Sequence, residues 1–429
     1  MERELVIGRI IKEFLERREK ILERDLQVPI NHELQKAITI VGPRRSGKTY
    51  LLLSHFQQIS NTPKIFFPLD DDRIYPPTLN DLDISLKVLK ELYPDAGGRP
   101  YMFFDEIQEV PKWELFIKRV VERESALVYV TGSSSKLLSK EIATELRGRT
   151  ITYELFPFNF KELMKINGMH PEKFITTAKE SKIKKLVKDY LAFGGFPEVV
   201  LKNEKRKILT EYADIMFYRD FVERHKIKNL KVARVFFNLL FNSFAKEISV
   251  NKIFNFMKSQ GIKTSRNMLY NYLEYLHDAY LIFPLRKFSY SLKEIEQSIP
   301  KMYSIDNGLA GVFNTEFQES IGRLMENAVF IELRKSGLVE NKNIFYYKTA
   351  DGKEADFCIR EGSHFNQLIQ VCYDISDIGT KEREIKGLLK ASEELRCDNL
   401  LIITWDYEAE EATGKKKIVY APLWKWLMK

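Results

Sequence analysis

Eight residues near the N-terminus have the types and the spacing of a loop that binds phosphate. Gly42 and Gly47 enclose four residues, and Lys48 and Thr49 follow directly, which completes the pattern G-x-x-x-x-G-K-[ST]. The glycines let the backbone wrap a phosphate so that N–H groups point at it. We expect Lys48 to reach the β and γ phosphates and the Thr49 hydroxyl to bind Mg²⁺. The pattern therefore predicts a site for a nucleoside triphosphate with Mg²⁺.

The sequence on either side of this loop supports the same interpretation. An apolar segment, Ala37–Val41, enters the loop as a strand would, and an apolar run from Tyr50 to Leu53 leaves it as a helix would. The context argues against the alternative, a glycine-rich turn without function. The residues that we expect to bind the nucleotide are Gly42, Pro43, Arg44, Arg45, Ser46, Gly47, Lys48, Thr49 and Tyr50.

Two adjacent acids end a second apolar segment, Tyr101–Phe104. Asp105 is predicted to hold Mg²⁺, directly or through water, and Glu106 to polarise the attacking water as a general base. A solvated turn is the alternative. Because the acids follow Thr49 by 56 residues (105 minus 49), we expect them on a strand next to the one that enters the loop, where they face the phosphates.

A third apolar segment, Leu127–Thr131, leads into Gly132 and a run of serines. A polar side chain at this strand end could touch the γ-phosphate or the attacking water, and Thr131 and Ser133 are the two candidates. The serine run could instead cap a helix. The sequence leaves both interpretations open.

Two arginines, Arg147 and Arg149, flank a glycine shortly after this segment. An arginine placed on the γ-phosphate stabilises the charge of the transition state, and it could come from a neighbouring subunit. We favour Arg149 for this role, and an ordinary surface loop is the alternative. The chain has no [NT]-K-x-D signature for guanine, so ATP is preferred over GTP.

The segments that must position these residues alternate between strand and helix patterns. This order is typical of an α/β fold, with a parallel sheet flanked by helices. The predicted strands are Ala37–Val41, Lys64–Pro68, Tyr101–Phe104, Leu127–Thr131 and Thr150–Leu155. One helix is predicted to open at Gly47, and others cover Leu79–Leu92 and Trp113–Glu122.

Beyond Pro157 the patterns are helical, and strands return only near Met302–Ile305. A small helical lid is predicted at Asn159–Asn167 and Lys173–Phe193, before Gly194 and Gly195. Three closely connected helices follow at Val232–Phe244, Val250–Gln260 and Ser265–Ala279. A second α/β unit has helices at Ile321–Lys335 and Lys381–Leu395, and strands at Ile344–Lys348, Glu354–Ile359, Leu368–Tyr373 and Leu400–Thr404.

The composition is that of a folded protein with a basic surface. The 429 residues are 44% hydrophobic and 12% aromatic, which argues against a disordered chain. The net charge of +8 favours a polyanionic partner, with nucleic acid as the first candidate and a merely lysine-rich surface as the alternative. No apolar run approaches the length of a membrane helix, and the N-terminus has the pattern of an exposed amphipathic helix. We expect a cytoplasmic protein that does not contact membranes.

Together these motifs resemble a known group, the AAA-type P-loop ATPases of archaea and bacteria with a characteristic C-terminal domain of unknown function. The matching segments are GPRRSGKT, FFDEIQEV, TGSSSKLLS, LRGRT, LFPFNFKEL, YLAFGGFPEVV, YRDFV, YSIDNGLAG, ENAVFIEL and EADF. The resemblance covers nearly the whole chain. It implies an ATPase domain at 1–157, a helical lid at 158–225, a winged helix at 226–295 and a restriction-endonuclease-like domain at 296–429. It also implies that the turn 194–197 lies near the nucleotide, and because such proteins often form rings, a homo-oligomer is among the expected partners.

The implied winged helix has residue types that contact DNA at the start of its third helix. These are Lys263, Thr264, Ser265, Arg266 and Asn267. Glu274 and Asp278 on the same helix weaken this prediction. A protein–protein or interdomain module is the alternative.

The implied nuclease-like domain has an incomplete set of charged residues. Glu326 and Asp356 are the acids that remain, whereas Gln370 and Cys372 stand where the pattern has an acid and a lysine. A thiol cannot replace an ammonium group, so we predict a degenerate site without DNA cleavage. The basic run 415–417 could contact a phosphate backbone, although a solvated hairpin is the alternative.

The sequence thus predicts an ATPase that binds ATP with Mg²⁺ and acts as a switch or motor on DNA or a DNA-associated complex. Two alternatives come from other classes. One is a signalling or scaffold protein that uses nucleotide only to change partners, and the other is an ATP-regulated nuclease.

Overall fold

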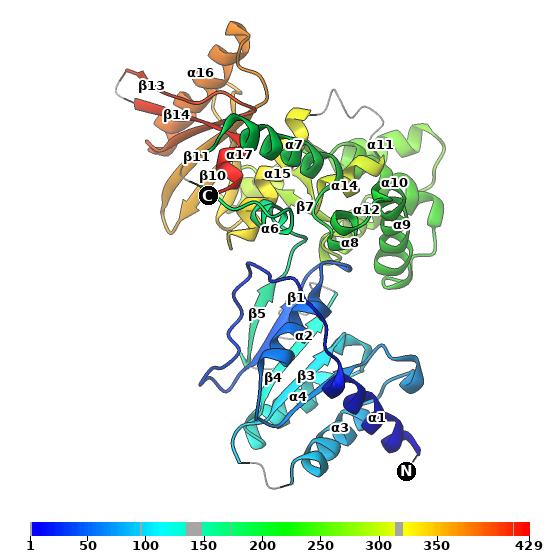
Figure 1. The fold of residues 1–429 in the computed structure, drawn as a ribbon. Coiled ribbons are helices and arrows are strands. Elements are labelled where there is room, and N and C mark those ends of the chain that lie inside the picture. Colours follow the sequence, from blue (N-terminus) through cyan, green and yellow to red (C-terminus); the bar gives the residue numbers. More distant parts are fainter. Residues whose placement is uncertain (1, 95–96, 134–147, 173, 314–320, 415) are drawn as a thin grey trace. The chain divides into compact units, whose positions relative to one another are not determined.

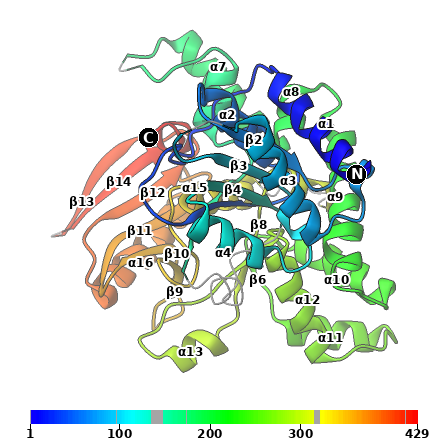
Figure 2. The same ribbon diagram turned by 90° about the horizontal axis from the view of Figure 1, so that it is seen from below.

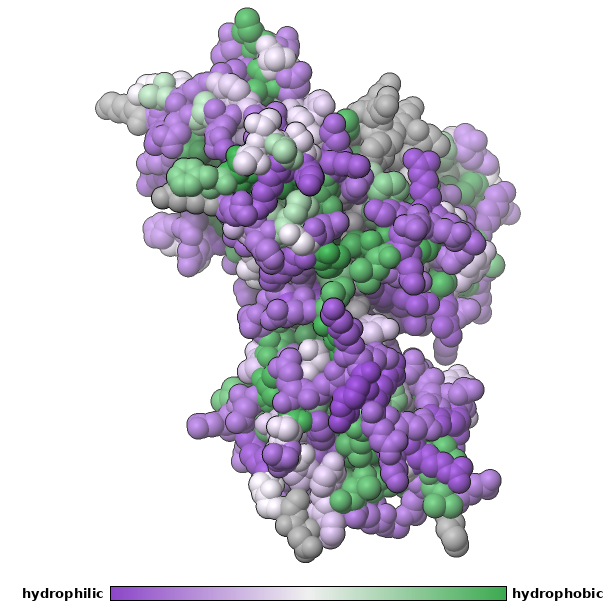
Figure 3. Space-filling model, viewed as in Figure 1, coloured by the Kyte–Doolittle hydropathy of each residue, from purple (hydrophilic) through white to green (hydrophobic). Residues whose placement is uncertain are grey.

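The computed structural model describes residues 2–94, 97–133, 148–172, 174–313, 321–414 and 416–429 (Figure 1). The chain forms two compact units, Met1–Phe156 and Pro157–Lys429. No helix among the described residues is both long and apolar enough to span a membrane. On the face drawn in Figure 3, hydrophilic residues cover most of each unit.

The first unit is built on a parallel sheet of five strands (Figure 1). The strands are β1 (Ala37–Val41), β2 (Lys64–Pro68), β3 (Tyr101–Asp105), β4 (Leu127–Gly132) and β5 (Thr150–Glu154). Each of β1, β3 and β4 is buried along its whole length, as expected for strands covered on both faces. The sheet confirms the predicted α/β fold, and every predicted strand of this unit begins at the predicted residue.

The strand order is β2-β3-β4-β1-β5, so β4 lies between β1 and β3. The prediction that the strand of Asp105 lies next to the strand of the phosphate loop is therefore wrong. The crossover from β1 to β2 passes over two strand positions, and β3 and β4 later fill them. As a result Thr131 at the end of β4, paired with Ile40 of β1, lies between the loop and the two acids.

Helices α2 (Lys48–Gln58), α3 (Leu79–Leu92) and α4 (Trp113–Arg123) connect the strands, with single turns η1 (Asp72–Ile74) and η2 (Ile107–Glu109). The N-terminal helix α1 (Glu2–Glu16) contacts α3 and β2 (Figure 2). Its apolar face is buried at Ile7, Ile10 and Ile11, and Arg3 pairs with the buried Asp81 at 2.6 Å. The helix was predicted to be exposed. That prediction is wrong for its apolar face, because α3 and β2 cover this face.

The second unit begins with helices and ends with a mixed sheet. The helices are α6 (Phe160–Ile166), α7 (Thr177–Phe193), α8 (Pro197–Leu201), α9 (Lys205–Ile215), the π-helix η4 (Met216–Glu223), α10 (Leu230–Asn242), α11 (Val250–Ser259), α12 (Arg266–Asp278), α13 (Leu292–Gln297) and α14 (Asn307–Phe313). A small antiparallel sheet has the order β6-β8-β7, with β6 (Lys246–Glu247), β7 (Ile282–Leu285) and β8 (Lys301–Ser304). The further predicted division of this unit into three domains stays a prediction.

A six-stranded sheet with the order β13-β14-β12-β11-β10-β9 forms the end of this unit. Its strands are β9 (Ile344–Lys348), β10 (Glu354–Glu361), β11 (His364–Cys372), β12 (Leu400–Thr404), β13 (Ala409–Thr413) and β14 (Lys416–Pro422). Helices α15 (Ile321–Lys335), α16 (Ile378–Leu395) and α17 (Leu423–Leu427) accompany them. Lys416 and Lys417 of the basic run lie in the hairpin of β13 and β14, which was the alternative interpretation of that run. The two strands themselves were not predicted, because β13 is polar along most of its length.

Candidate nucleotide site

The loop between β1 and α2 has a backbone geometry that requires its glycines. Gly42 has a φ of +149°, and a Cβ atom there would lie 2.1 Å from the Leu155 carbonyl oxygen, so no larger residue fits. Gly47 has a φ of 96° in the left-handed region, and α2 begins at the next residue. The loop thus turns back on itself and presents the N-terminus of α2 to an anion.

Lys48 is held inside this loop. It is 4% exposed, and its ammonium donates hydrogen bonds to the carbonyl oxygens of Gly42 (3.1 Å) and Pro43 (2.9 Å). The Ser46 hydroxyl is buried and has no hydrogen-bond partner within the described residues. A buried hydroxyl without a partner costs free energy. These contacts fit a loop that can exchange its internal hydrogen bonds for those of a phosphate.

The remaining loop residues lie around this centre. Arg45 has a φ of 69°, and Tyr50 is 55% exposed on the first turn of α2. The Arg44 charge acts on Glu106 and lowers the pKa of that carboxyl group. Arg24, which no sequence pattern marked, donates to the Ser46 carbonyl oxygen at 2.9 Å and so ties the loop to the preceding segment.

The structure brings the two predicted metal ligands into contact. The Thr49 hydroxyl donates a hydrogen bond of 2.7 Å to Asp105 Oδ2, and Asp105 is 3% exposed. A hydroxyl and a carboxylate are the hard oxygen donors that Mg²⁺ takes together with phosphates and waters. Burial, followed by the charges of Glu106 and Asp70, raises the pKa of Asp105 to about 6. The carboxyl group is therefore ionised, as a metal ligand must be, above that pH.

Glu106 stands at the point where the chain turns out of the sheet. Its φ of 52° is unusual for a residue with a side chain and is typical of functional sites. Burial raises the pKa of its carboxyl group, but Lys48, Gln108, Arg44 and Ser133 together outweigh burial and lower it. An ionised carboxylate close to the Lys48 ammonium can accept a proton from water.

Thr131 and Ser133 hold the two acids in different ways. The Thr131 hydroxyl donates to Asp105 Oδ1 and accepts the Glu106 N–H at 3.0 Å, so both of its hydrogen-bonding roles are used within the protein. Ser133 is 1% exposed and hydrogen-bonds the Glu106 side chain. Thr131 is thus placed to position the acids, and Ser133 is placed beside the candidate base.

The structure describes one of the two candidate arginines, Arg149. Arg147 lies outside the described residues. Arg149 precedes β5, where its carbonyl oxygen accepts the Ala37 N–H at 2.7 Å, and its guanidinium pairs with Glu122 of α4. Since β1 and β5 are parallel, Arg149 lies at the edge of the sheet opposite the phosphate loop. Any action of Arg149 on a γ-phosphate would have to come from a neighbouring subunit.

Asp70 is a further candidate for the site, which no sequence motif marked. It follows β2, whose Pro68 is paired with Asp105 of β3, so it lies at the same edge of the sheet as the acids. Partial burial and the Glu106 charge raise the pKa of Asp70, while Arg44 lowers it. The available signal was three consecutive aspartates, Asp70 to Asp72, directly after an apolar strand.

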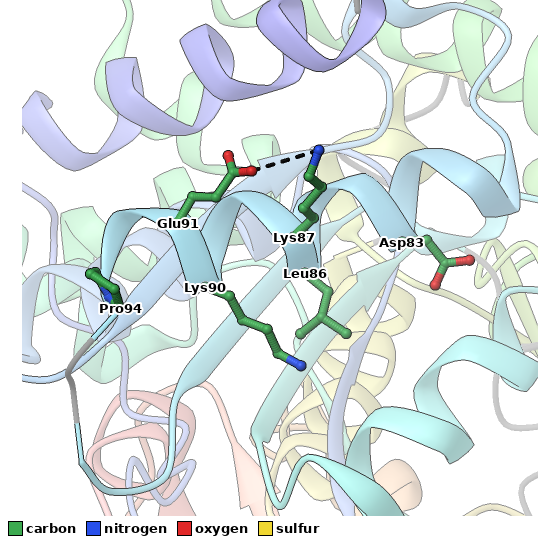
Figure 4. A pocket seen from close by; sticks show the side chains of 6 residues that line it. All are labelled: Asp83, Leu86, Lys87, Lys90, Glu91 and Pro94. Atoms are coloured by element: carbon green, nitrogen blue, oxygen red, sulfur yellow. Dashed lines mark ion pairs between the residues drawn. The ribbon is translucent and has the colours of Figure 1, made fainter.

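A hollow of about 490 Å³ lies elsewhere on this unit, over the second half of α3 (Figure 4). It is lined by Asp83, Leu86, Lys87, Lys90, Glu91 and Pro94. Lys87 pairs with Glu91 at 3.6 Å, and Lys90 pairs with Glu124 at 2.9 Å, so its cations are already neutralised. The hollow lies at the end of α3 that leads to the start of β3, away from the phosphate loop.

The second unit brings the residues of the predicted degenerate site together. Glu326 and Asp356 both contact the ammonium of Lys301, at 2.9 and 3.0 Å. Gln370 accepts the Asp356 N–H at 3.2 Å, and burial raises the pKa of the Cys372 thiol to about 11. A lysine ammonium nevertheless lies among these acids, because β8 supplies Lys301, which no sequence spacing relates to them. The predicted absence of DNA cleavage stays a prediction.

Three family models match this chain. Residues 34–164 match a family model described as an AAA domain. Residues 184–319 and 321–426 match two domains of unknown function, DUF8612 and DUF4143. The phosphate loop, both acids, Thr131 and Ser133 all fall within the AAA domain.

Two curated relatives span nearly the whole chain. An uncharacterised protein of Methanocaldococcus jannaschii, MJ1544, is 41% identical over 437 residues, which cover 99% of this chain and 96% of that protein. An uncharacterised protein of Haemophilus influenzae is 26% identical over 390 residues, which cover 90% and 93%.

Likeness to solved structures is weaker. AMPPCP-bound DnaA from Aquifex aeolicus aligns with a TM-score of 0.26 at 13% identity, covering 65% of this chain and 88% of that chain. The Aeropyrum pernix ORC1 protein in complex with DNA aligns with a TM-score of 0.29 at 12% identity, covering 77% and 93%. Scores of this size support no conclusion about function.

Proposed function

The chain belongs to the family of the uncharacterised Methanocaldococcus jannaschii protein MJ1544 and contains an AAA domain, and on this premise we propose that it binds ATP with Mg²⁺ and hydrolyses the ATP. The observation that carries the proposal is the hydrogen bond of 2.7 Å between Thr49 and Asp105. It joins the phosphate loop to the two acids across the sheet.

Binding uses groups that the loop already holds in place. The N–H groups at the start of α2 point at the phosphates. The Lys48 ammonium leaves the Gly42 and Pro43 carbonyl oxygens and binds the β and γ phosphates instead. Thr49 and Asp105 would hold a Mg²⁺ ion, whose charge would neutralise phosphate charge.

Hydrolysis then requires a base beside the γ-phosphate. Glu106 accepts a proton from a water molecule while the water oxygen bonds to the γ-phosphorus. The bond between that phosphorus and the β–γ bridging oxygen breaks, which yields ADP and inorganic phosphate. The lowered pKa of Glu106 keeps this carboxylate ionised near neutral pH.

Release of phosphate from ATP by the purified chain tests the proposal, and Thr131→Val sharpens the test. Valine keeps the shape of threonine but removes the hydroxyl that holds Asp105 and the Glu106 N–H. We expect kcat to fall by about 10- to 100-fold with little change in ATP affinity, since the acids lose their shared support. Thr131→Ser, which restores the hydroxyl, should recover most of the rate. Equal rates in wild type and Thr131→Val would remove Thr131 from the site.

A second part of the proposal is that α12 contacts duplex DNA. The element order α10, β6, α11, α12, β7, α13, β8 with the sheet order β6-β8-β7 supports a winged helix in which α13 lies in the connection between β7 and β8. The exposed residues of α12 include an arginine, two asparagines and a tyrosine, which are Arg266, Asn267, Tyr270 and Asn271. Arginine and asparagine are the side chains that most often read guanine and adenine.

Arg266→Ala should weaken binding to duplex DNA by about 10-fold at low salt, because a contact to a base or phosphate is lost. Fluorescence anisotropy with a labelled duplex measures this, and affinity should also fall as salt rises. The control is Arg206→Ala, which removes the same charge from an exposed position of α9. Equal affinities of Arg266→Ala and wild type would exclude α12 as the contact. Slow ATP turnover that DNA does not stimulate would favour a scaffold role instead.

A further inference from the structure

Lys301 is a buried lysine in the second unit, 4% exposed on strand β8. A lysine is almost never buried this deeply unless it is paired. Its ammonium contacts three carboxylates, those of Glu354 (2.5 Å), Glu326 (2.9 Å) and Asp356 (3.0 Å). The ammonium donates hydrogen bonds to Glu326 and Asp356 and forms an ion pair with Glu354, so all three acids meet at one cation.

The carboxylates around this ammonium are themselves held in place. The Tyr303 hydroxyl donates to Glu326 at 2.6 Å, and the Val371 N–H donates to Asp356 Oδ2 at 2.9 Å. Gln370 bonds the backbone of Asp356 with its carbonyl oxygen and donates from its amide nitrogen to Glu384 at 2.7 Å. The acids are thus oriented toward one point, and the Lys301 ammonium lies at that point.

We propose that the Lys301 ammonium is the resident cation of this acidic site, so that the site is closed to divalent metal ions in the wild-type chain. The hydrogen bonds of 2.9 and 3.0 Å to Glu326 and Asp356 have the length of ammonium contacts and exceed the 2.0–2.1 Å that Mg²⁺ demands. Within the described residues, no group of three or more acidic, histidine or cysteine side chains is arranged to hold a metal ion.

This assignment also explains how two sheets of the second unit are joined. Lys301 comes from the small sheet of β6, β7 and β8, whereas its acids come from α15 and from β10 of the large sheet. A second set of contacts joins the same two sheets. Glu247 of β6 pairs with Lys348 of β9 at 2.6 Å and accepts a hydrogen bond of 3.0 Å from the Tyr346 hydroxyl of β9. The Lys301 ammonium therefore links the small sheet, which lies in the same segment of the chain as α12, to the large sheet.

Lys301→Met tests the assignment, because methionine keeps the length of the side chain and removes its charge. The unfolding midpoint of the full chain is measured without nucleotide, in EDTA and in millimolar CaCl₂. Ca²⁺ is the probe because it accepts oxygen ligands at longer distances than Mg²⁺ does. We expect Lys301→Met to lower the midpoint in EDTA by about 5–10 °C and Ca²⁺ to restore at least half of that loss. The wild-type midpoint should not respond to Ca²⁺.

Two controls isolate the site. Lys301→Met with Asp356→Asn should show no restoration by Ca²⁺, and Lys348→Met, which removes a half-buried lysine at the rim, should gain no response to Ca²⁺. If Lys301→Met does not fold, Lys301→Met with Glu354→Gln repeats the test with one negative charge fewer. A wild-type midpoint that rises with Ca²⁺ and loses this response in Asp356→Asn would overturn the proposal. A loss of stability that Ca²⁺ does not restore would also overturn it.

Discussion

Glu106→Gln should lower kcat for ATP hydrolysis by about 10²- to 10⁴-fold and leave ATP affinity nearly unchanged. Glutamine has the shape of glutamate and can keep the contacts to Gln108 and Ser133, but it cannot accept a proton from water. The loss therefore falls on the chemical step. Steady-state phosphate release at saturating ATP measures kcat, and a titration with a fluorescent ATP analogue measures affinity.

The matched control for this prediction is Glu109→Gln. Glu109 is an exposed acid three residues further along the same turn, and it has no place in the site. Its substitution should leave kcat at the wild-type value. Wild-type turnover in Glu106→Gln would show that Glu106 is not the base. The lowered pKa of its carboxyl group would then have no part in catalysis.

Lys48→Ala should weaken ATP binding by about 10²-fold or more. The ammonium is expected to make two charge-assisted hydrogen bonds to phosphate oxygens, each of which contributes on the order of 1.5–3 kcal/mol. Alanine is short and uncharged, so the side chain at position 48 can no longer bind the phosphates. Isothermal titration with ATP and Mg²⁺ measures the affinity directly.

The control for this second prediction is Lys90→Ala, which removes the same charge from an exposed position of α3. Its ATP affinity should equal that of the wild type. The unfolding midpoint of Lys48→Ala should stay close to the wild-type value, since the Gly42 and Pro43 carbonyl oxygens that lose a partner belong to the loop and not to the apolar core. Unchanged ATP affinity in a folded Lys48→Ala chain would contradict the assignment of the loop.

Local sequence was sufficient for the parts of the site that depend on neighbours in the chain. The phosphate loop is contiguous, and its glycines are dictated by backbone conformation, as the close approach of Gly42 to Leu155 illustrates. Strand starts in the first unit followed from apolar segments, and α3 has the predicted bounds, Leu79–Leu92. In each case, residues adjacent in sequence determine the outcome.

Features set by contacts between distant segments could not be predicted in the same way. The position of β4 between β1 and β3 depends on the connections between strands that are distant in the sequence. This position allows Thr131 to hydrogen-bond both acids. Arg24 reaches the loop from an irregular segment without any pattern. Lys301 meets Glu326 and Asp356 only because β8 packs beside α15 and β10.

The nucleotide that remains bound after incubation with ATP and Mg²⁺ is the most direct measure of the central claim, that loop and acids form one hydrolytic site. Wild type and Glu106→Gln are each mixed with ATP, separated from free nucleotide and analysed by chromatography. We expect ADP on the wild type and intact ATP on Glu106→Gln. The same ratio of ADP to ATP on both chains, or no bound nucleotide on either, would contradict it.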